Sequence, residues 1–134
     1  VQPGAYQLVS ASGIGEDLDL GLAADPRRPI TGHVVTSVIH GAPSTLILDF
    51  YVLQSGRSIN DFTPSGNDVP LLAAGFYNLT GLTFEVTVAE SDSNTVLAGP
   101  LTIDTTVEGI KRLLIIDANG GGTPPQLILQ DAVN

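Results

Sequence analysis

Short runs in which apolar residues recur at every second position dominate this chain, and this period is typical of β-strands. The clearest run covers residues 83–89, where Phe84, Val86 and Val88 alternate with polar side chains. Residues 33–40 alternate in the same way, so each strand is predicted to turn one face to a core and the other to solvent. The 15 glycines and 9 prolines are spread between such runs and break any long helical pattern.

Two runs differ because they are apolar on both faces. Residues 46–53, apart from Asp49, and residues 112–116 have this character and are predicted to be central strands. Further strands are expected at 101–104 and 126–130, with a weaker one at 69–73. Turn sequences lie between the runs, at residues 41–44, 54–57 (a predicted hairpin turn), 91–94 and 119–125. The chain is therefore expected to be all-β, an immunoglobulin-like antiparallel β-sandwich with an N-terminal strand-forming arm.

The first 31 residues have a different organisation. Residues 5–10 form a candidate strand, and residues 16–22 place leucine at every second position. A segment with two prolines, residues 25–29, then interrupts the pattern. We predict an arm and proline-braced linker over 1–31 and a β-sandwich domain over 32–134. Residues 1–25 contain four acidic side chains and no basic one, so the arm is negative on one face and apolar on the other.

Composition excludes several classes of protein. The chain has 14 acidic and 5 basic side chains, and its net charge of −9 opposes binding to nucleic acid or anionic membranes. Without cysteine it has no disulfide, thiolate metal site or cysteine nucleophile. No run reaches about 18 apolar residues, so no membrane span is expected. The chain contains no methionine and starts at Val1, which predicts signal-peptide removal and an extracellular or cell-surface location.

Four short motifs resemble one family. Val-Ile-His-Gly-Ala-Pro at 38–43 and Asp-Phe-Tyr-Val at 49–52 are similar to its V-V-H-A-S-P-D-A-P and V-D-V-Y-V patterns. Leu-Ala-Ala-Gly-Phe-Tyr at 72–77 is similar to L-P-A-G-T-Y, and residues 83–98 are similar to its V-x-V-x-x-A-G-S…V-L region. From about residue 34 to the end, the chain thus resembles the DUF4397 family of extracellular β-sandwich domains.

The chain departs from that family pattern at two places. Gly41 stands where the family has a small alanine, and residues 78–82 look like an insertion before a strand. The family has no assigned activity. The resemblance therefore implies an exported, immunoglobulin-like module and no particular chemistry.

Polar residues inside the predicted strands are candidates for chemistry. Ser37, His40 and Asp49 could be drawn as a triad, but the chain lacks a nucleophile elbow and an oxyanion loop. We expect His40 to have a structural hydrogen-bonding role and Asp49 to accept hydrogen bonds from a neighbouring loop. His33 and His40 are an odd number of residues apart and face opposite sides of one strand, which disfavours a shared metal. The chain is expected to be no enzyme and to hold no cofactor or metal.

Three weaker signals concern ions and modification. Glu16, Asp17 and Asp19 could offer oxygen ligands to Ca²⁺, as could the loop at 60–68, but the first set alternates with leucine as a solvated strand face does. Asn78-Leu79-Thr80 is an acceptor sequence, which makes Asn78 a possible glycosylation site. Lys111, the only lysine, could form an isopeptide bond, although a surface charge at a strand start is favoured.

The leading functional hypothesis is a non-catalytic, exported subunit of a pilus-like extracellular filament or surface matrix. The arm would add a strand to a neighbouring copy, giving a homopolymer without nucleic-acid partners and without membrane insertion of the mature chain. The predicted donor residues of this subunit interface are Tyr6, Leu8, Val9, Leu18, Leu20 and Leu22.

Two other classes remain open. A monomeric cell-surface adhesion or ligand-binding module would fold the arm back onto its own sheet, and the sequence leaves open whether the arm pairs in cis or in trans. A hydrolase would need a pocket with converging polar groups, of which the sequence shows none. Tyr6, Tyr51 and Tyr77 are far apart in the sequence, so a sugar-stacking groove is not indicated.

Overall fold

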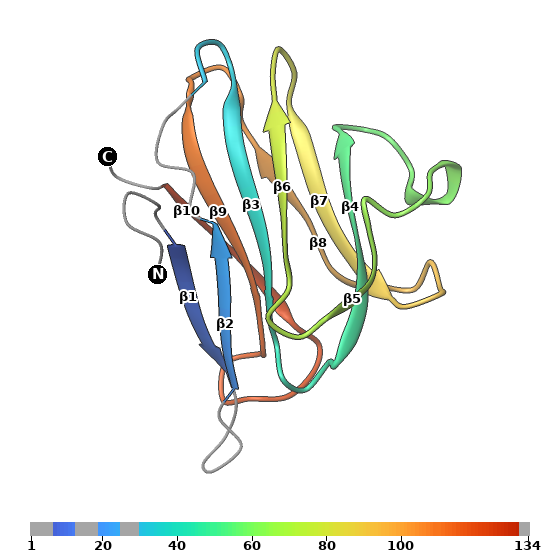
Figure 1. Ribbon diagram of the computed structural model, residues 1–134. Coiled ribbons are helices and arrows are strands. Elements are labelled where there is room, and N and C mark those ends of the chain that lie inside the picture. Colours follow the sequence, from blue (N-terminus) through green and yellow to red (C-terminus); the bar gives the residue numbers. More distant parts are fainter. Residues whose placement is uncertain (1–6, 13–18, 25–29, 132–134) are drawn as a thin grey trace.

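A computed structural model of the chain describes residues 7–12, 19–24 and 30–131 (Figure 1). It contains ten strands and one short 3₁₀ helix in this part of the chain. Their bounds are β1 (Gln7–Ser12), β2 (Asp19–Ala24), β3 (Val34–Gly41), β4 (Ile47–Gln54), η1 (Ile59–Asp61), β5 (Gly66–Pro70), β6 (Ala74–Leu79), β7 (Phe84–Glu90), β8 (Val96–Ile103), β9 (Gly109–Ile116) and β10 (Gln126–Asp131).

Eight of these strands form two four-stranded sheets that pack face to face. One sheet has the order β10-β9-β3-β6 and is called the β3 sheet below; the other has the order β5-β4-β7-β8 and is called the β4 sheet. The predicted all-β sandwich is confirmed, as are the central positions of β4 and β9. One pairing differs from the antiparallel expectation, because β3 and β9 run parallel from Val34↔Gly109 to Gly41↔Ile116.

The core lies between the sheets and follows the alternation of each strand. Val34 and Val38 enter it from β3, and Leu48 and Phe50 enter it from β4. The Phe50 ring meets the Tyr77 ring edge-on, with centroids 6.0 Å apart, which joins the two sheets. Each fully buried aliphatic side chain of this kind stabilises the fold by about 1.5–3 kcal/mol.

Three predictions about local structure are wrong. The expected strand at 69–73 contains only the last two residues of β5 and the turn after it, because Leu72 adopts a positive φ of 69° and the chain turns there into β6. The turn at 54–57 exists, since the Arg57 N–H donates to the Gln54 carbonyl, but it leads into η1 rather than a hairpin. β8 starts at Val96 rather than residue 101, because Pro100 is accommodated within this edge strand.

The N-terminal arm forms a hairpin of its own. β1 and β2 pair antiparallel with each other, from Gln7↔Ala24 to Ser12↔Asp19, and neither joins the ladder of a four-stranded sheet. The predicted strand-forming arm is therefore confirmed as a hairpin. Figure 1 places it on the side of the sandwich made by β10, β9 and β3, and β1 comes close to β3.

Candidate functional site

The most unusual surface of the sandwich is the outer face of the β3 sheet. Val34 and Val38 point into the core, so Val35, Ser37 and Ile39 must point the other way. All three are nevertheless buried, with 3–4% of their surface exposed. A sheet face open to water normally exposes every second residue. β3 is therefore covered on both sides, and β1 is the strand outside the sandwich that lies close to it.

The neighbours of these residues extend an apolar surface across the sheet. Ile110 pairs with Val35, Leu114 pairs with Ile39, and Ile128 of β10 pairs with Leu114. Arg112 lies in the middle of this surface, paired with Ser37. Below, the outer face of the β3 sheet means the outward residues Val35, Ser37, Ile39, Phe76, Ile110, Arg112, Leu114, Ile116 and Ile128.

This surface differs from the sequence-based expectation. Residues 33–40 are predicted to have one solvated face, whereas the structure buries both faces of β3. The adjacent apolar pairs Val34–Val35 and Val38–Ile39 are the signal of burial on both sides.

The predicted donor residues fall largely in the hairpin. Leu8 and Val9 belong to β1, and Leu20 and Leu22 belong to β2. The register sets Val9 opposite Leu22, so the structure brings these two positions together. Tyr6 and Leu18 lie outside the described residues, as do Glu16 and Asp17 of the possible calcium cluster.

Asp49, on the outer face of the β4 sheet, holds the backbone of the edge strand β5 and of the turn that follows β7. It is 2% exposed and points away from the core, and its carboxylate accepts hydrogen bonds from the Asp68 N–H (2.7 Å) and the Asp92 N–H (3.2 Å). Ser91 in turn donates to the Asp68 carboxylate. The prediction that Asp49 accepts hydrogen bonds from a neighbouring loop is confirmed by Asp92, and the second donor, Asp68, belongs to strand β5.

A second chain of hydrogen bonds covers the same face. The Tyr51 hydroxyl donates to Asn94 Oδ1 (3.1 Å), and Asn94 Nδ2 donates to Asn60 Oδ1 (3.0 Å). Burial, followed by the nearby negative charge of Asp49, raises the pKa of Tyr51. Loops of this chain therefore shield the outer face of the β4 sheet.

The oxygen-rich loop at 60–68 uses its side chains on this network. Asn60 binds Asn94, and Asn67 Nδ2 donates to Asp68 Oδ2 (2.9 Å). Among the described residues, no three His, Cys, Asp or Glu side chains are grouped so that they could hold a metal ion. The structure also separates the possible triad: Ser37 faces outward from β3, whereas His40 three positions on faces the opposite way.

His40 lies at the end of β3 with 1% of its surface exposed. Its backbone is held by the Ala73 carbonyl and the Leu72 N–H, and its Nδ1 accepts the Ala42 N–H (3.3 Å). Its Nε2 has no hydrogen-bond partner within the part of the chain that the structure describes. Burial lowers the pKa of His40, with partial opposition from the backbone of Thr45 and Leu46 and from the Asp117 carboxylate. The ring thus fixes the β3–β4 turn, which agrees with a structural role.

Stability should therefore fall in acid through His40. The unfolded chain has a histidine pKa of about 6.5 and binds the proton more readily than the fold does, so unfolding becomes easier as pH drops below that value. We expect His40→Gln to flatten the loss of unfolding free energy between about pH 7.5 and pH 5 in urea titrations. His33→Gln serves as the control, and an unchanged pH slope in His40→Gln would contradict the assignment.

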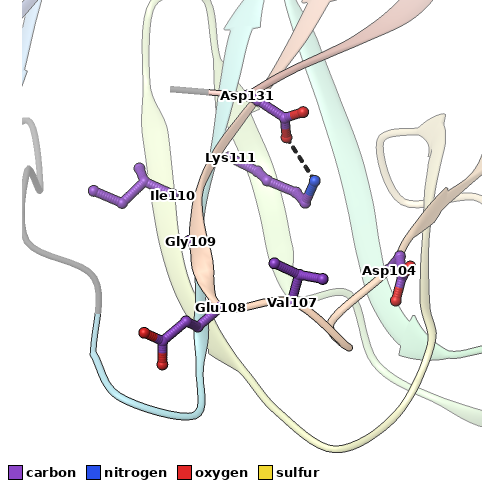
Figure 2. A pocket seen from close by; sticks show the side chains of 7 residues that line it. All are labelled: Asp104, Val107, Glu108, Gly109, Ile110, Lys111 and Asp131. Carbon is purple, nitrogen blue, oxygen red and sulfur yellow. Dashed lines mark hydrogen bonds and ion pairs between the residues drawn. The ribbon is translucent and has the colours of Figure 1, made fainter. Parts of the chain in front are cut away.

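A cavity of about 390 Å³ lies beside the start of β9 (Figure 2). Lys111 and Asp131 point toward each other there and form an ion pair of 2.6 Å. Glu108 points away and accepts the Gly32 N–H, while hydrogen bonds from Thr106 lower the pKa of Asp104. Lys111 contacts a carboxylate of the neighbouring strand rather than an asparagine. This contact agrees with an ion pair between strands and not with an isopeptide bond. The charged side chains that line this cavity contact other groups of the same chain, and they do not point toward a common centre.

The remaining candidate is Asn78, which lies exposed on β6 opposite Val35. Thr80 of the same acceptor sequence donates to the Gly32 carbonyl (2.6 Å). Over residues 7–12, 19–24 and 30–131, no helix has the length and hydropathy needed to cross a bilayer.

Comparison with known proteins adds no relative: no protein family, no curated protein and no solved structure matches this chain. The resemblance to the DUF4397 family therefore stays a prediction. Fold and surfaces define the class of protein, an all-β sandwich with a separate N-terminal hairpin.

Proposed function

We propose that this protein is a non-catalytic, exported structural subunit that assembles with copies of itself into an extracellular filament or surface matrix. The observation that carries the proposal is the pairing of the arm. Within the described ranges, its two strands pair only with each other and join no ladder of the sandwich. The arm is thus an additional strand-forming unit that a copy can donate to its neighbour by strand addition.

The free edges of the sheets support the same function. As far as the structure describes the chain, β10, β6, β5 and β8 each pair on one side only. Edge strands that expose backbone N–H and C=O groups are templates for pairing with another chain. A donor and an acceptor at different places on one subunit give a head-to-tail contact, which propagates without closing.

The test uses the full chain with its leucine pattern altered. We expect Leu18→Ser, Leu20→Ser and Leu22→Ser together to abolish filaments in electron micrographs, because the arm loses the apolar side chains that would fill a neighbour's surface. Ser10→Ala with Ser12→Ala changes polar positions of the same arm and should leave assembly intact. Filaments that persist in the leucine variant would refute the proposal.

One observation favours a second candidate, a monomeric cell-surface module. β1 comes close to β3 of the same chain, as it would if the hairpin were a permanent part of its own subunit. Light scattering on the purified full chain separates the two functions. A single monomeric species at every concentration supports the module, and mass that grows with concentration supports the filament.

A further inference from the structure

We infer that the outer face of the β3 sheet is the acceptor surface of the assembly, and that its occupant is the β1–β2 hairpin of a second copy of this chain. This inference rests on the proposed function and names the surface that receives the arm. It replaces pairing at a sheet edge by packing on a sheet face, since the donated strands form a third layer over the neighbour's sheet.

β3 is buried on the side that points away from the core. Val35, Ser37 and Ile39 are 3–4% exposed on this side, and Ile110 beside them is 4% exposed. On the opposite side of the molecule, loops that hydrogen-bond to Asp49 and Tyr51 cover the β4 sheet. The outer face of the β3 sheet instead has β1 close by. The element that lies over the outer face of the β3 sheet is therefore a β-hairpin.

The charges of the face and the arm are complementary. Arg112 is the only charged residue among those that define this face, and it lies between the apolar pairs Val35–Ile110 and Ile39–Leu114. The arm brings four acidic residues and no basic one within its first 25 positions. A partly buried guanidinium recognises carboxylates with directed hydrogen bonds. The arm and the face thus carry opposite charges. Because Asp17 and Asp19 alternate with the leucines, this charge acts over the arm as a whole, and the leucines supply the apolar contact.

The linker is long enough for an exchange of hairpins. Nine residues, 25–33, separate the end of β2 from the start of β3, and they can span about 30 Å when extended. Removing the hairpin from its own subunit breaks no ladder hydrogen bond of either described sheet. The same contacts can then form on a neighbour, which is the geometry of a domain swap.

A charge reversal of the full chain tests this surface. Arg112→Glu makes the face repel the acidic arm, and Glu16→Lys with Asp17→Lys and Asp19→Lys makes the arm repel the basic face. We expect each variant alone to lose sedimentable filaments, reducing them to the level of a filament-free control. A 1:1 mixture should restore them, because each arm then matches the face of the other variant.

Two controls accompany the reversal. Arg112→Lys keeps the charge and should keep assembly. Arg57→Glu reverses an exposed charge next to Gln54, at the end of β4, and should also assemble normally.

The outcomes separate the acceptor surface from the function. If Arg112→Glu forms normal filaments while the leucine variant of the arm does not, the surface is refuted and the filament function stands. If neither charge variant assembles and the mixture stays dispersed, the surface is again refuted. If the wild-type chain is monomeric at every concentration, the function and the exchange of hairpins both fail.

Discussion

Asp49→Ala should destabilise the sandwich by about 2–5 kcal/mol in urea unfolding. The substitution removes the acceptor of two backbone N–H groups, those of Asp68 and Asp92. Both hydrogen bonds are part-buried and end on a charged acceptor, and the loss of each costs about 1–3 kcal/mol. Both residues adopt positive φ angles, 49° and 57°, so the carboxylate also holds the backbone of β5 and of the turn after β7 in an uncommon conformation.

Two further variants sharpen this experiment. Asp49→Asn keeps one oxygen acceptor and places an amide nitrogen toward the other donor, so it should lose about half as much stability. Asp61→Ala removes an exposed carboxylate in η1 and should stay within about 0.5 kcal/mol of the wild type. Equal losses for Asp49→Ala and Asp61→Ala would contradict the role given to Asp49.

Gly99→Ala is expected to destabilise the protein by about 2–5 kcal/mol. Gly99 has a φ of 94°, and a Cβ there would lie 2.6 Å from the Val86 carbonyl oxygen and 3.3 Å from Leu127 Cδ1. The conformational strain costs about 1–2 kcal/mol. Overpacking against the backbone of β7 adds about 1–3 kcal/mol, because β8 must move away.

Gly120→Ala is the matched control, because Gly120 has the same φ of 94° and a Cβ at this position would meet no described atom within 4 Å. It carries the conformational cost alone. The difference between the two unfolding free energies therefore measures the close approach of β8 to β7. Identical losses in the two variants would show that this approach does not constrain the fold.

Much of the fold follows from local pattern. The alternating runs at 33–40 and 83–89, and the run at 46–53 that is apolar on both faces, predict the bounds of β3, β7 and β4 to within one residue. The central position of β4 follows from apolar residues on both of its faces. The start of β6 could not be predicted, because it depends on the left-handed turn at Leu72. Leucine rarely adopts a positive φ, so its presence in the sequence does not indicate such a turn.

Groupings of distant residues are harder to predict than single strands. The role of Asp49 could be predicted from its position in an apolar strand, whereas its two partners lie in β5 and in the turn after β7, 19 and 43 residues away. The outer face of the β3 sheet joins β3 to residues of β9 and β10 far along the chain. Pairing between distant strands is set by the tertiary fold, so the grouping of Val35 with Ile110 was not accessible from sequence.

The parallel pairing of β3 with β9 also determines when the β3 sheet can form during synthesis of the chain. Val34 pairs with Gly109, which is 75 residues further along the chain. The β3 sheet therefore cannot form completely until β9 has emerged from a ribosome or a translocation channel. Contacts of such sequence separation make folding slow. A chain with this topology therefore keeps an incomplete β3 sheet until β9 has emerged.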